Sequence, residues 1–112
     1  MLFKTKEDFY CKAAQARRLS SEEEIALAAQ MKNGSESARS ALIESYLPAV
    51  ASYVRRHERK GEGLARVYAY LSALTRLVDE YDFSRGREPF LRLLRLSVQK
   101  ETVRYIANGE QR

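Results

Sequence analysis

Arginine and lysine side chains gather in the second half of this chain, where they could bind a polyanion. Residues 1–54 carry seven Lys and Arg against seven Asp and Glu, whereas residues 55–112 carry thirteen against eight. An excess of this kind attracts phosphates by Coulomb forces and by release of counterions. The uneven charge therefore indicates DNA or RNA as a ligand, with a basic surface that only aids solubility as the alternative.

Five cations of the last predicted helix are suited to phosphate contacts. They are Arg87, Arg92, Arg95, Lys100 and Arg104. Contacts to phosphate position a protein on nucleic acid without selecting a base sequence. The alternative for these residues is an ordinary solvated helix surface.

The residue types that carry most catalytic chemistry are sparse. With one histidine, His57, and one cysteine, Cys11, imidazole and thiolate ligands cannot assemble a zinc or iron site. Adjacent carboxylates such as Glu22 and Glu23 point to different sides of a helix. No glycine-rich phosphate loop or nucleophile elbow is present in the sequence. We therefore predict a protein that is not an enzyme and needs no metal or cofactor.

Length and composition predict one helical domain spanning residues 1–112. A chain of 112 residues is large enough for a single small core. Two prolines, five glycines and 45% apolar residues fit a helical protein, and the alternating stretches typical of strands are missing. We expect an all-α fold, a compact bundle of about five helices.

Two helices are expected before residue 34. The first covers about residues 5–18. The second begins at Ser20, because Ser20-x-x-Glu23 fits a capping box, and the acidic residues 22–24 suit the positive end of the helix dipole. The Asn-Gly pair at residues 33–34 tolerates the backbone of a helix C-terminus and should end it.

A third helix is expected from Ser35. Its apolar residues recur at intervals of four, three and four: Ile43, Leu47, Val50 and Val54. Pro48 lacks an amide donor and clashes with the preceding turn, so the helix should bend or divide there. The charged residues 55–63, which include His57 and two glycines, are then predicted to form a linker.

The next apolar stripe is the most regular in the chain. Its members lie three or four residues apart: Leu64, Val67, Leu71, Leu74, Val78 and Tyr81. A stripe of this width packs on neighbouring helices. After a turn at residues 82–86, Pro89 suits the first turn of a last helix that runs to about Ala107 and ends at residues 108–109. Four of its apolar residues should face the core: Phe90, Leu94, Val98 and Ile106.

No sequence feature predicts export or membrane insertion. Met1-Leu2-Phe3 is followed by charged residues, which rules out the apolar core of a signal peptide. No window approaches the roughly 18 uncharged apolar residues of a membrane span. A lone Cys11 cannot close an intramolecular disulfide. We expect a cytoplasmic protein.

Three segments carry a family resemblance. Residues 19–28 read LSSEEEIALA, residues 34–50 read GSESARSALIESYLPAV, and residues 74–86 read LTRLVDEYDFSRG. In this order they resemble the end of region 1.2, the start of region 2 and the end of the polymerase-binding helix of bacterial sigma-70 family RNA polymerase sigma factors. The likeness covers about residues 10–106, with the helix in residues 1–19 placed at the end of region 1.2.

The resemblance implies a transcription initiation factor domain that binds the clamp of the largest subunit of core RNA polymerase. The family docks through an acidic and amide face of the fourth helix, whose positions here are Ala65, Tyr68, Ala69, Ser72 and Arg76. None of these residues is acidic, which weakens any docking by opposite charge. Tyr68 either supplies an apolar contact there or lies at the edge of the core.

The last helix corresponds to the part of the family that melts and reads the minus-ten promoter element. In the family, aromatic residues there stack on unpaired bases. If Phe90 matches the conserved phenylalanine of the family, its tryptophan pair falls at Leu96 and Ser97, and no aromatic platform remains. A shift of one residue instead places Gln99 and Thr102 on the family's Gln-x-x-Thr pair, which contacts promoter DNA. Both registers stay open.

The resemblance implies core RNA polymerase and promoter DNA as partners, with an anti-sigma protein as a further one, and no membrane. The alternative is a sigma-fold regulatory or antagonist module that binds polymerase or another protein without melting a promoter. A third possibility is a structural bundle that buries the stripe of residues 64–81 between two copies. The 112 residues contain no counterpart of the helical domain with which family members read the minus-thirty-five element.

Overall fold

Six α-helices and one 3-10 helix make up the described part of the chain, which contains no strand. The computed structural model describes the backbone of residues 2–110 and the side chains of residues 2–104. The elements are α1 (Lys6–Gln15), α2 (Ser21–Lys32), α3 (Glu36–Ser45), α4 (Leu47–His57), α5 (Ala65–Glu80), η1 (Phe83–Arg85) and α6 (Arg87–Glu110). The all-α prediction is confirmed, with one helix more than the five expected.

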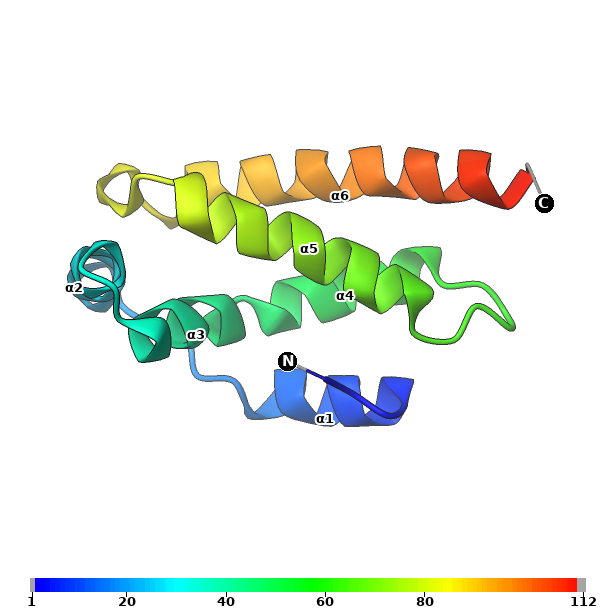
Figure 1. Ribbon diagram of the computed structural model, residues 1–112, viewed down its shortest axis with the longest axis horizontal. Coiled ribbons are helices and arrows are strands. Elements are labelled where there is room, and N and C mark those ends of the chain that lie inside the picture. Colours follow the sequence, from blue (N-terminus) through cyan, green and yellow to red (C-terminus); the bar gives the residue numbers. More distant parts are fainter. Residues whose placement is uncertain (1, 111–112) are drawn as a thin grey trace.

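The helices lie side by side in a short stack. Figure 1 shows α6 beside α5, α5 crossing the row formed by α3 and α4, and α1 on the far side of that row, with α2 closing one end. The radius of gyration is 14.4 Å, close to the value of about 13 Å for a compact domain of this length. The chain therefore forms a single globule, which is elongated along α6 with extents of 43 × 25 × 23 Å.

The capping box that begins α2 is present as predicted. The Glu23 amide donates to Ser20 Oγ at 3.1 Å, and the Ser20 amide donates to Glu23 Oε1 at 3.0 Å. The preceding helix α1 is shorter than expected and ends at Gln15, because Ala16 has an extended backbone. Beyond that break, Arg17 turns toward α2 and donates to Glu23 Oε2 at 2.8 Å.

Pro48 divides the third predicted helix into α3 and α4. Tyr46 is both the C-cap of α3 and the N-cap of α4. Pro48 lies in the first turn of α4, where a backbone amide has no partner within the helix, so the missing amide of proline breaks no helical hydrogen bond. The apolar stripe survives the division, since Ile43, Leu47, Val50 and Val54 are all buried. The sequence predicted that the helix would either bend or divide at Pro48, and the structure shows that it divides.

The charged linker was predicted to begin too early. Residues 55–57 form the last turn of α4, so the connection to α5 covers only residues 58–64. Contacts with α1 hold this turn, because the Arg55 guanidinium lies 4.5 Å from the centre of the Tyr10 ring, and the Tyr10 hydroxyl donates to Glu58 at 3.1 Å. His57 is exposed, as expected.

The long apolar stripe is buried inside the chain, except that its first member, Leu64, is half-buried against the core. Val67, Leu71, Leu74, Val78 and Tyr81 all belong to the core cluster, packed between α6 on one side and α3 and α4 on the other. The stripe is therefore not available to join two copies, which removes the basis for a self-associating bundle.

The turn at residues 81–86 folds α6 back along α5. Asp82 Oδ1 accepts hydrogen bonds from the amide and the hydroxyl of Ser84 at 3.0 and 2.6 Å. Gly86 has a φ of +94°, a backbone conformation that favours glycine, and its carbonyl accepts from the Tyr81 hydroxyl at 2.6 Å. The turn that the sequence predicts at residues 82–86 is thus present, and α5 and α6 form a helical hairpin around it.

The end of α6 was predicted wrongly. The helix continues through the Asn-Gly pair at residues 108–109 as far as Glu110. Glycine costs a helix only about 1 kcal/mol relative to alanine, so an Asn-Gly pair does not compel an end. Phe90, Leu94 and Val98 are buried as expected, whereas the side chain of Ile106 lies outside the described residues.

We predict that acid removes the stabilisation supplied by Glu23. Hydrogen bonds from Arg17, together with those at Ser20, lower the pKa of this carboxyl from 4.5 to about 2. A carboxyl with a lowered pKa contributes stability that is complete above about pH 4.5 and is lost as the pH falls toward 2. Urea unfolding should show wild type more stable than Glu23→Gln near neutral pH, with the difference shrinking between pH 4.5 and 2.

The matched control is Glu22→Gln, which removes an exposed carboxyl from the same turn that makes no hydrogen bond to a described residue. The Glu22→Gln variant should still lose the stability supplied by Glu23 as the pH falls from 4.5 to 2, as wild type does. A wild-type advantage over Glu23→Gln that stays constant with pH would contradict the assignment.

Candidate nucleic-acid and partner-binding faces

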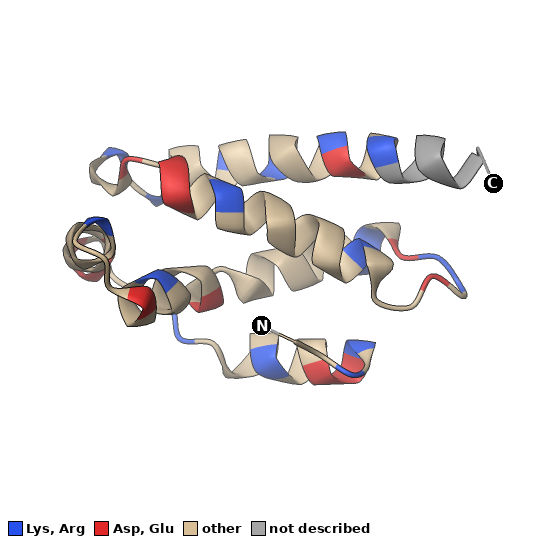
Figure 2. Cartoon of the chain, in the orientation of Figure 1, with Lys and Arg blue, Asp and Glu red and all other residues tan. Residues whose placement is uncertain are grey.

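The outer face of α6 is basic and free of acidic residues over three turns. Arg92, Arg95, Gln99 and Lys100 are all exposed, and no Asp or Glu occurs in residues 89–100. None of the three cations pairs with a carboxylate among the described residues. Figure 2 shows Lys and Arg recurring along α6. Four of the seven predicted DNA-binding residues therefore share one accessible face.

Arg87 is directed into the protein instead of outward. Its guanidinium lies 4.7 Å from the centre of the Tyr46 ring, and its Nη1 atom lies 3.9 Å from Glu24 Oε2. That Nη1 atom is buried and has no hydrogen-bond partner among the described residues. Arg87 thus ties the start of α6 to α2 and to the junction of α3 and α4.

Glu24 and Tyr46 form a buried polar contact that the sequence did not predict. Glu24 is only 2% exposed, and its carboxylate accepts a short hydrogen bond from the Tyr46 hydroxyl. Burial, strengthened by this hydrogen bond, raises the pKa of Tyr46 above its usual value. From the sequence, Glu24 was expected only to suit the helix dipole, and its position one turn before the apolar Ala28 was the one local hint that it faces the core.

Thr102 belongs to a second polar chain, which joins α5 to α6. The Thr102 hydroxyl donates to the Val98 carbonyl at 3.0 Å, so it accepts from the Tyr70 hydroxyl at 2.5 Å. Tyr70 in turn accepts from Arg66 Nη1 at 2.9 Å. The predicted DNA contact Thr102 is therefore half-buried and already holds the helical hairpin together.

Arg66 is a buried charge that sequence reasoning missed. It is 1% exposed, and its Nε atom donates to Glu62 Oε1 at 2.9 Å. Burial by itself would raise the pKa of Glu62, but hydrogen bonds from Arg66 and from the Arg59 backbone outweigh it and lower the pKa. This pair fixes the start of α5 to the loop before it.

Glu101 of α6 pairs with two arginines, Arg104 of the same helix and Arg76 of α5. Glu101 Oε1 accepts from Arg104 at 3.1 Å and from Arg76, on α5, at 3.5 Å. The two arginines remain well exposed. Exposed pairs of this kind contribute little to stability, so both guanidiniums can turn toward a ligand.

The positions predicted to bind polymerase do share the outer face of α5. Ala65, Ser72 and Arg76 are exposed, and Ala69 is half-buried. Tyr68 lies at the edge of the core, and its hydroxyl accepts from the Phe3 amide at 2.8 Å and donates to the Phe3 carbonyl at 3.2 Å. The N-terminal segment therefore covers one end of this face.

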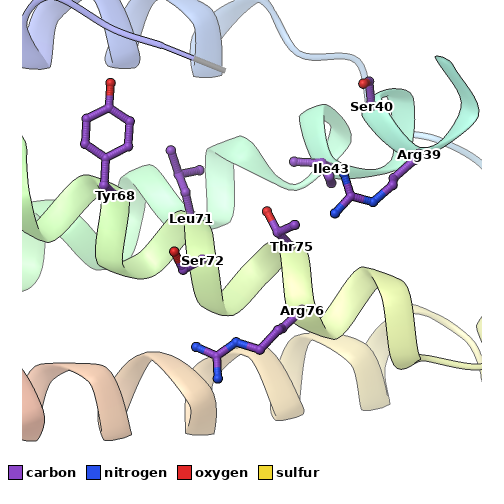
Figure 3. A pocket seen from close by; sticks show the side chains of 8 residues that line it. All are labelled: Arg39, Ser40, Ile43, Tyr68, Leu71, Ser72, Thr75 and Arg76. Atoms are coloured by element: carbon purple, nitrogen blue, oxygen red, sulfur yellow. The ribbon is translucent and has the colours of Figure 1, made fainter. Parts of the chain in front are cut away.

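An open groove of about 490 Å³ runs between this face and α3 (Figure 3). Eight residues line it: Arg39, Ser40, Ile43, Tyr68, Leu71, Ser72, Thr75 and Arg76. In Figure 3, Arg39 reaches from α3 toward α5, whereas Arg76 extends from α5 toward α6. The groove thus has an apolar floor, hydroxyl groups on its walls and an arginine on either side of α5.

Arg39 is held at the edge of the groove by Asp79. Its Nε and Nη2 atoms donate to the two carboxylate oxygens of Asp79 at 2.7 and 2.9 Å. These hydrogen bonds lower the pKa of Asp79. The pair joins α3 to the end of α5. Because the two residues are forty positions apart, no local sequence pattern predicts it.

The described side chains give no sign of a metal centre or a membrane span. Within residues 2–104, no three His, Cys, Asp or Glu side chains gather closely enough to hold a metal ion. Cys11 is exposed and unbridged. None of the described helices combines the length and the apolar character that crossing a bilayer requires.

Comparison with known proteins adds no family to this description. No protein family model matches the chain, and no curated protein matches it. The faces of α5 and α6 are therefore the features that bear on function.

We predict that Tyr46→Phe destabilises the protein by about 1–3 kcal/mol, because the buried Glu24 carboxylate loses its hydrogen-bond donor. Urea unfolding monitored by circular dichroism measures the change. The control is Tyr53→Phe, since Tyr53 is half-buried on α4 and its hydroxyl makes no hydrogen bond to a described residue. The control should change stability by less than about 0.5 kcal/mol. Equal stability of the two variants would show that the Glu24 contact is not stabilising.

Proposed function

We propose that this chain is a sigma-like, region 2 type transcription initiation factor domain that acts in the cytoplasm without catalysis or cofactor. It binds core RNA polymerase through the outer face of α5 and promoter DNA through the outer face of α6. The observation that carries the proposal is the acid-free face of Arg92, Arg95 and Lys100, presented by a hairpin whose turn has the family's Asp-x-Ser-Arg-Gly sequence at residues 82–86.

The charge arrangement on α6 supports the DNA half of the proposal. Arg92, Arg95 and Lys100 have no carboxylate partner among the described residues, so their charge is available to phosphates. Gln99 lies among them and carries an amide that can bond to a base edge. Arg87 and Thr102 act differently in this proposal, since their contacts hold α6 in place.

The groove beside α5 supports the polymerase half. Ser72 and Arg76 are exposed on its rim, with Ile43 and Leu71 in its floor, and a helical clamp can lie along such a surface. The face carries no acidic residue at the family's docking positions. Binding therefore has to rely more on shape and apolar contact than on opposite charge.

We predict that changing Arg92, Arg95 and Lys100 together to alanine weakens binding to a minus-ten duplex at least about tenfold at low salt. The slope of log affinity against log salt should fall by about 2.7, because three phosphate contacts are lost. Fluorescence anisotropy with labelled DNA over a salt series measures both quantities.

The matched control changes three exposed cations near the connection of α4 to α5, namely Arg56, Arg59 and Lys60. It alters net charge equally and should shift DNA affinity far less. If both triple variants lose affinity alike, binding is a property of overall charge and the α6 face is not the site.

We predict that Ser72→Trp lowers affinity for purified core RNA polymerase more than about tenfold, because the indole fills the groove where the clamp would lie. Pull-down and surface plasmon resonance with core enzyme measure the loss. Ala26→Trp on the exposed surface of α2 is the control and should bind as wild type does. Failure of wild-type protein to bind core enzyme would exclude the polymerase half.

One observation favours the alternative of a regulatory or antagonist module. Phe90 is fully buried, and no aromatic residue occupies the exposed part of α6 up to Arg104, so no aromatic ring described there can stack on an unpaired base. Footprinting a minus-ten promoter with core enzyme separates the two functions, because an initiation factor opens the duplex and an antagonist prevents opening.

A further inference from the structure

Two aliphatic side chains lie exposed in the middle of the basic face of α6. Leu96 is 46% exposed and Val103 is 68% exposed, whereas most large apolar side chains of the described chain are buried. They are seven residues apart, two helical turns or about 10.5 Å along the axis, so they lie on one line. Together with Gln99, Lys100 and Arg104 they line a shallow surface hollow.

Phosphate contacts leave these two side chains unexplained. DNA phosphates and sugars would pair with Arg92, Arg95 and Lys100 but would gain nothing from an aliphatic stripe between them. A second copy of this face would bury the stripe but would also oppose like charges, which is unfavourable. A ligand that satisfies both features must be apolar along one line and acidic beside it.

We propose that this face binds an acidic amphipathic helix of a partner protein. A helix with apolar residues every three or four positions would cover Leu96 and Val103, with glutamates or aspartates on its flanks facing the α6 cations. The cations lie on both sides of the stripe, Arg92 and Arg95 toward one side and Lys100 and Arg104 toward the other, as 100° per residue requires. Such a ligand pairs charge and buries apolar surface at the same time.

Binding of this helix would exclude DNA from α6, because both ligands need the same cations. The inference goes beyond the proposed function by supplying a regulator of the DNA-binding face. It does not depend on DNA binding, since the acidic helix requires only the exposed stripe and the exposed cations beside it, of which Arg92, Arg95 and Lys100 have no carboxylate partner among the described residues. An anionic membrane would also meet cations and aliphatic side chains, but two exposed side chains give little area for insertion.

The test uses the full chain and three synthetic helical peptides labelled for fluorescence anisotropy. One has a leucine seam flanked by glutamates, the second has the same seam flanked by lysines, and the third has the glutamates with an alanine seam. The first should bind, the second should not, and the third should bind at least about tenfold more weakly. The minus-ten duplex should displace the first peptide.

A double variant, Leu96→Ala with Val103→Ala, separates apolar docking from charge. It should weaken the glutamate and leucine peptide about tenfold or more while changing DNA affinity less than about twofold. Ile25→Ala, which truncates an apolar residue of α2 that is 45% exposed, is the matched control and should change neither affinity. Circular dichroism and thermal unfolding verify that all variants fold.

Any of three peptide results would overturn the inference. They are unchanged peptide affinity in the double variant, equal binding of the lysine-flanked peptide, and absence of binding by the first peptide. Stronger retention on anionic phosphatidylglycerol vesicles than on the peptide would also overturn it, in favour of a membrane surface. Loss of DNA binding with intact peptide binding would instead count only against the proposed function.

Discussion

Packing of four aromatic rings at one end of the bundle is the constraint on which the rest of the molecule depends. Phe90 of α6 lies 4.3 Å from Tyr46, 5.1 Å from Tyr81 and 5.4 Å from Phe83, measured between ring centres. These rings come from the junction of α3 and α4, from the turn after α5 and from α6. Because aromatic pairs favour defined geometries, the cluster fixes how α6 leaves the turn, beyond the contribution of apolar burial alone.

The direction of α6 in turn decides which of its side chains are accessible. With Phe90, Leu94 and Val98 held in the core, the helix turns Arg92, Leu96 and Lys100 outward. Glu101 lies toward α5, where it accepts from Arg76, and it also accepts from Arg104 at one edge of the basic face. The rotational setting of this one helix therefore presents Arg92, Arg95 and Lys100 to solvent without a carboxylate partner among the described residues, so they are available to an anionic ligand.

Buried polar groups add directional contacts to this apolar packing. Glu24 bonds to Tyr46 at the end near the turn, and Arg66 bonds to Tyr70 near the opposite end of α5, where Tyr70 reaches Thr102 of α6. Buried polar groups left without partners are costly, so a change in the rotation of α6 would break the bond to Thr102 as well as the packing. The bond of Tyr70 to Thr102, the contact of Arg87 with Glu24 and Tyr46, and the aromatic cluster consequently hold α6 in the same setting.

The sequence by itself determined what depends on local spacing: the all-α class, the capping box at Ser20, the break at Pro48 and the buried stripe of α5. Caps, prolines and helical periodicity act within a few residues, so they can be read without knowing the fold. The sequence did not determine that Arg87 and Thr102 turn inward, because their partners Glu24 and Tyr70 are distant in sequence. For the same reason it did not determine which cations of α6 remain without a carboxylate partner among the described residues, namely Arg92, Arg95 and Lys100. Only tertiary packing brought the inward-turning side chains and their partners together, and it also decided where α4 ends, since contacts with α1 outweighed the linker signal. The Asn-Gly signal in α6 failed for a local reason, because one glycine costs a helix too little to end it.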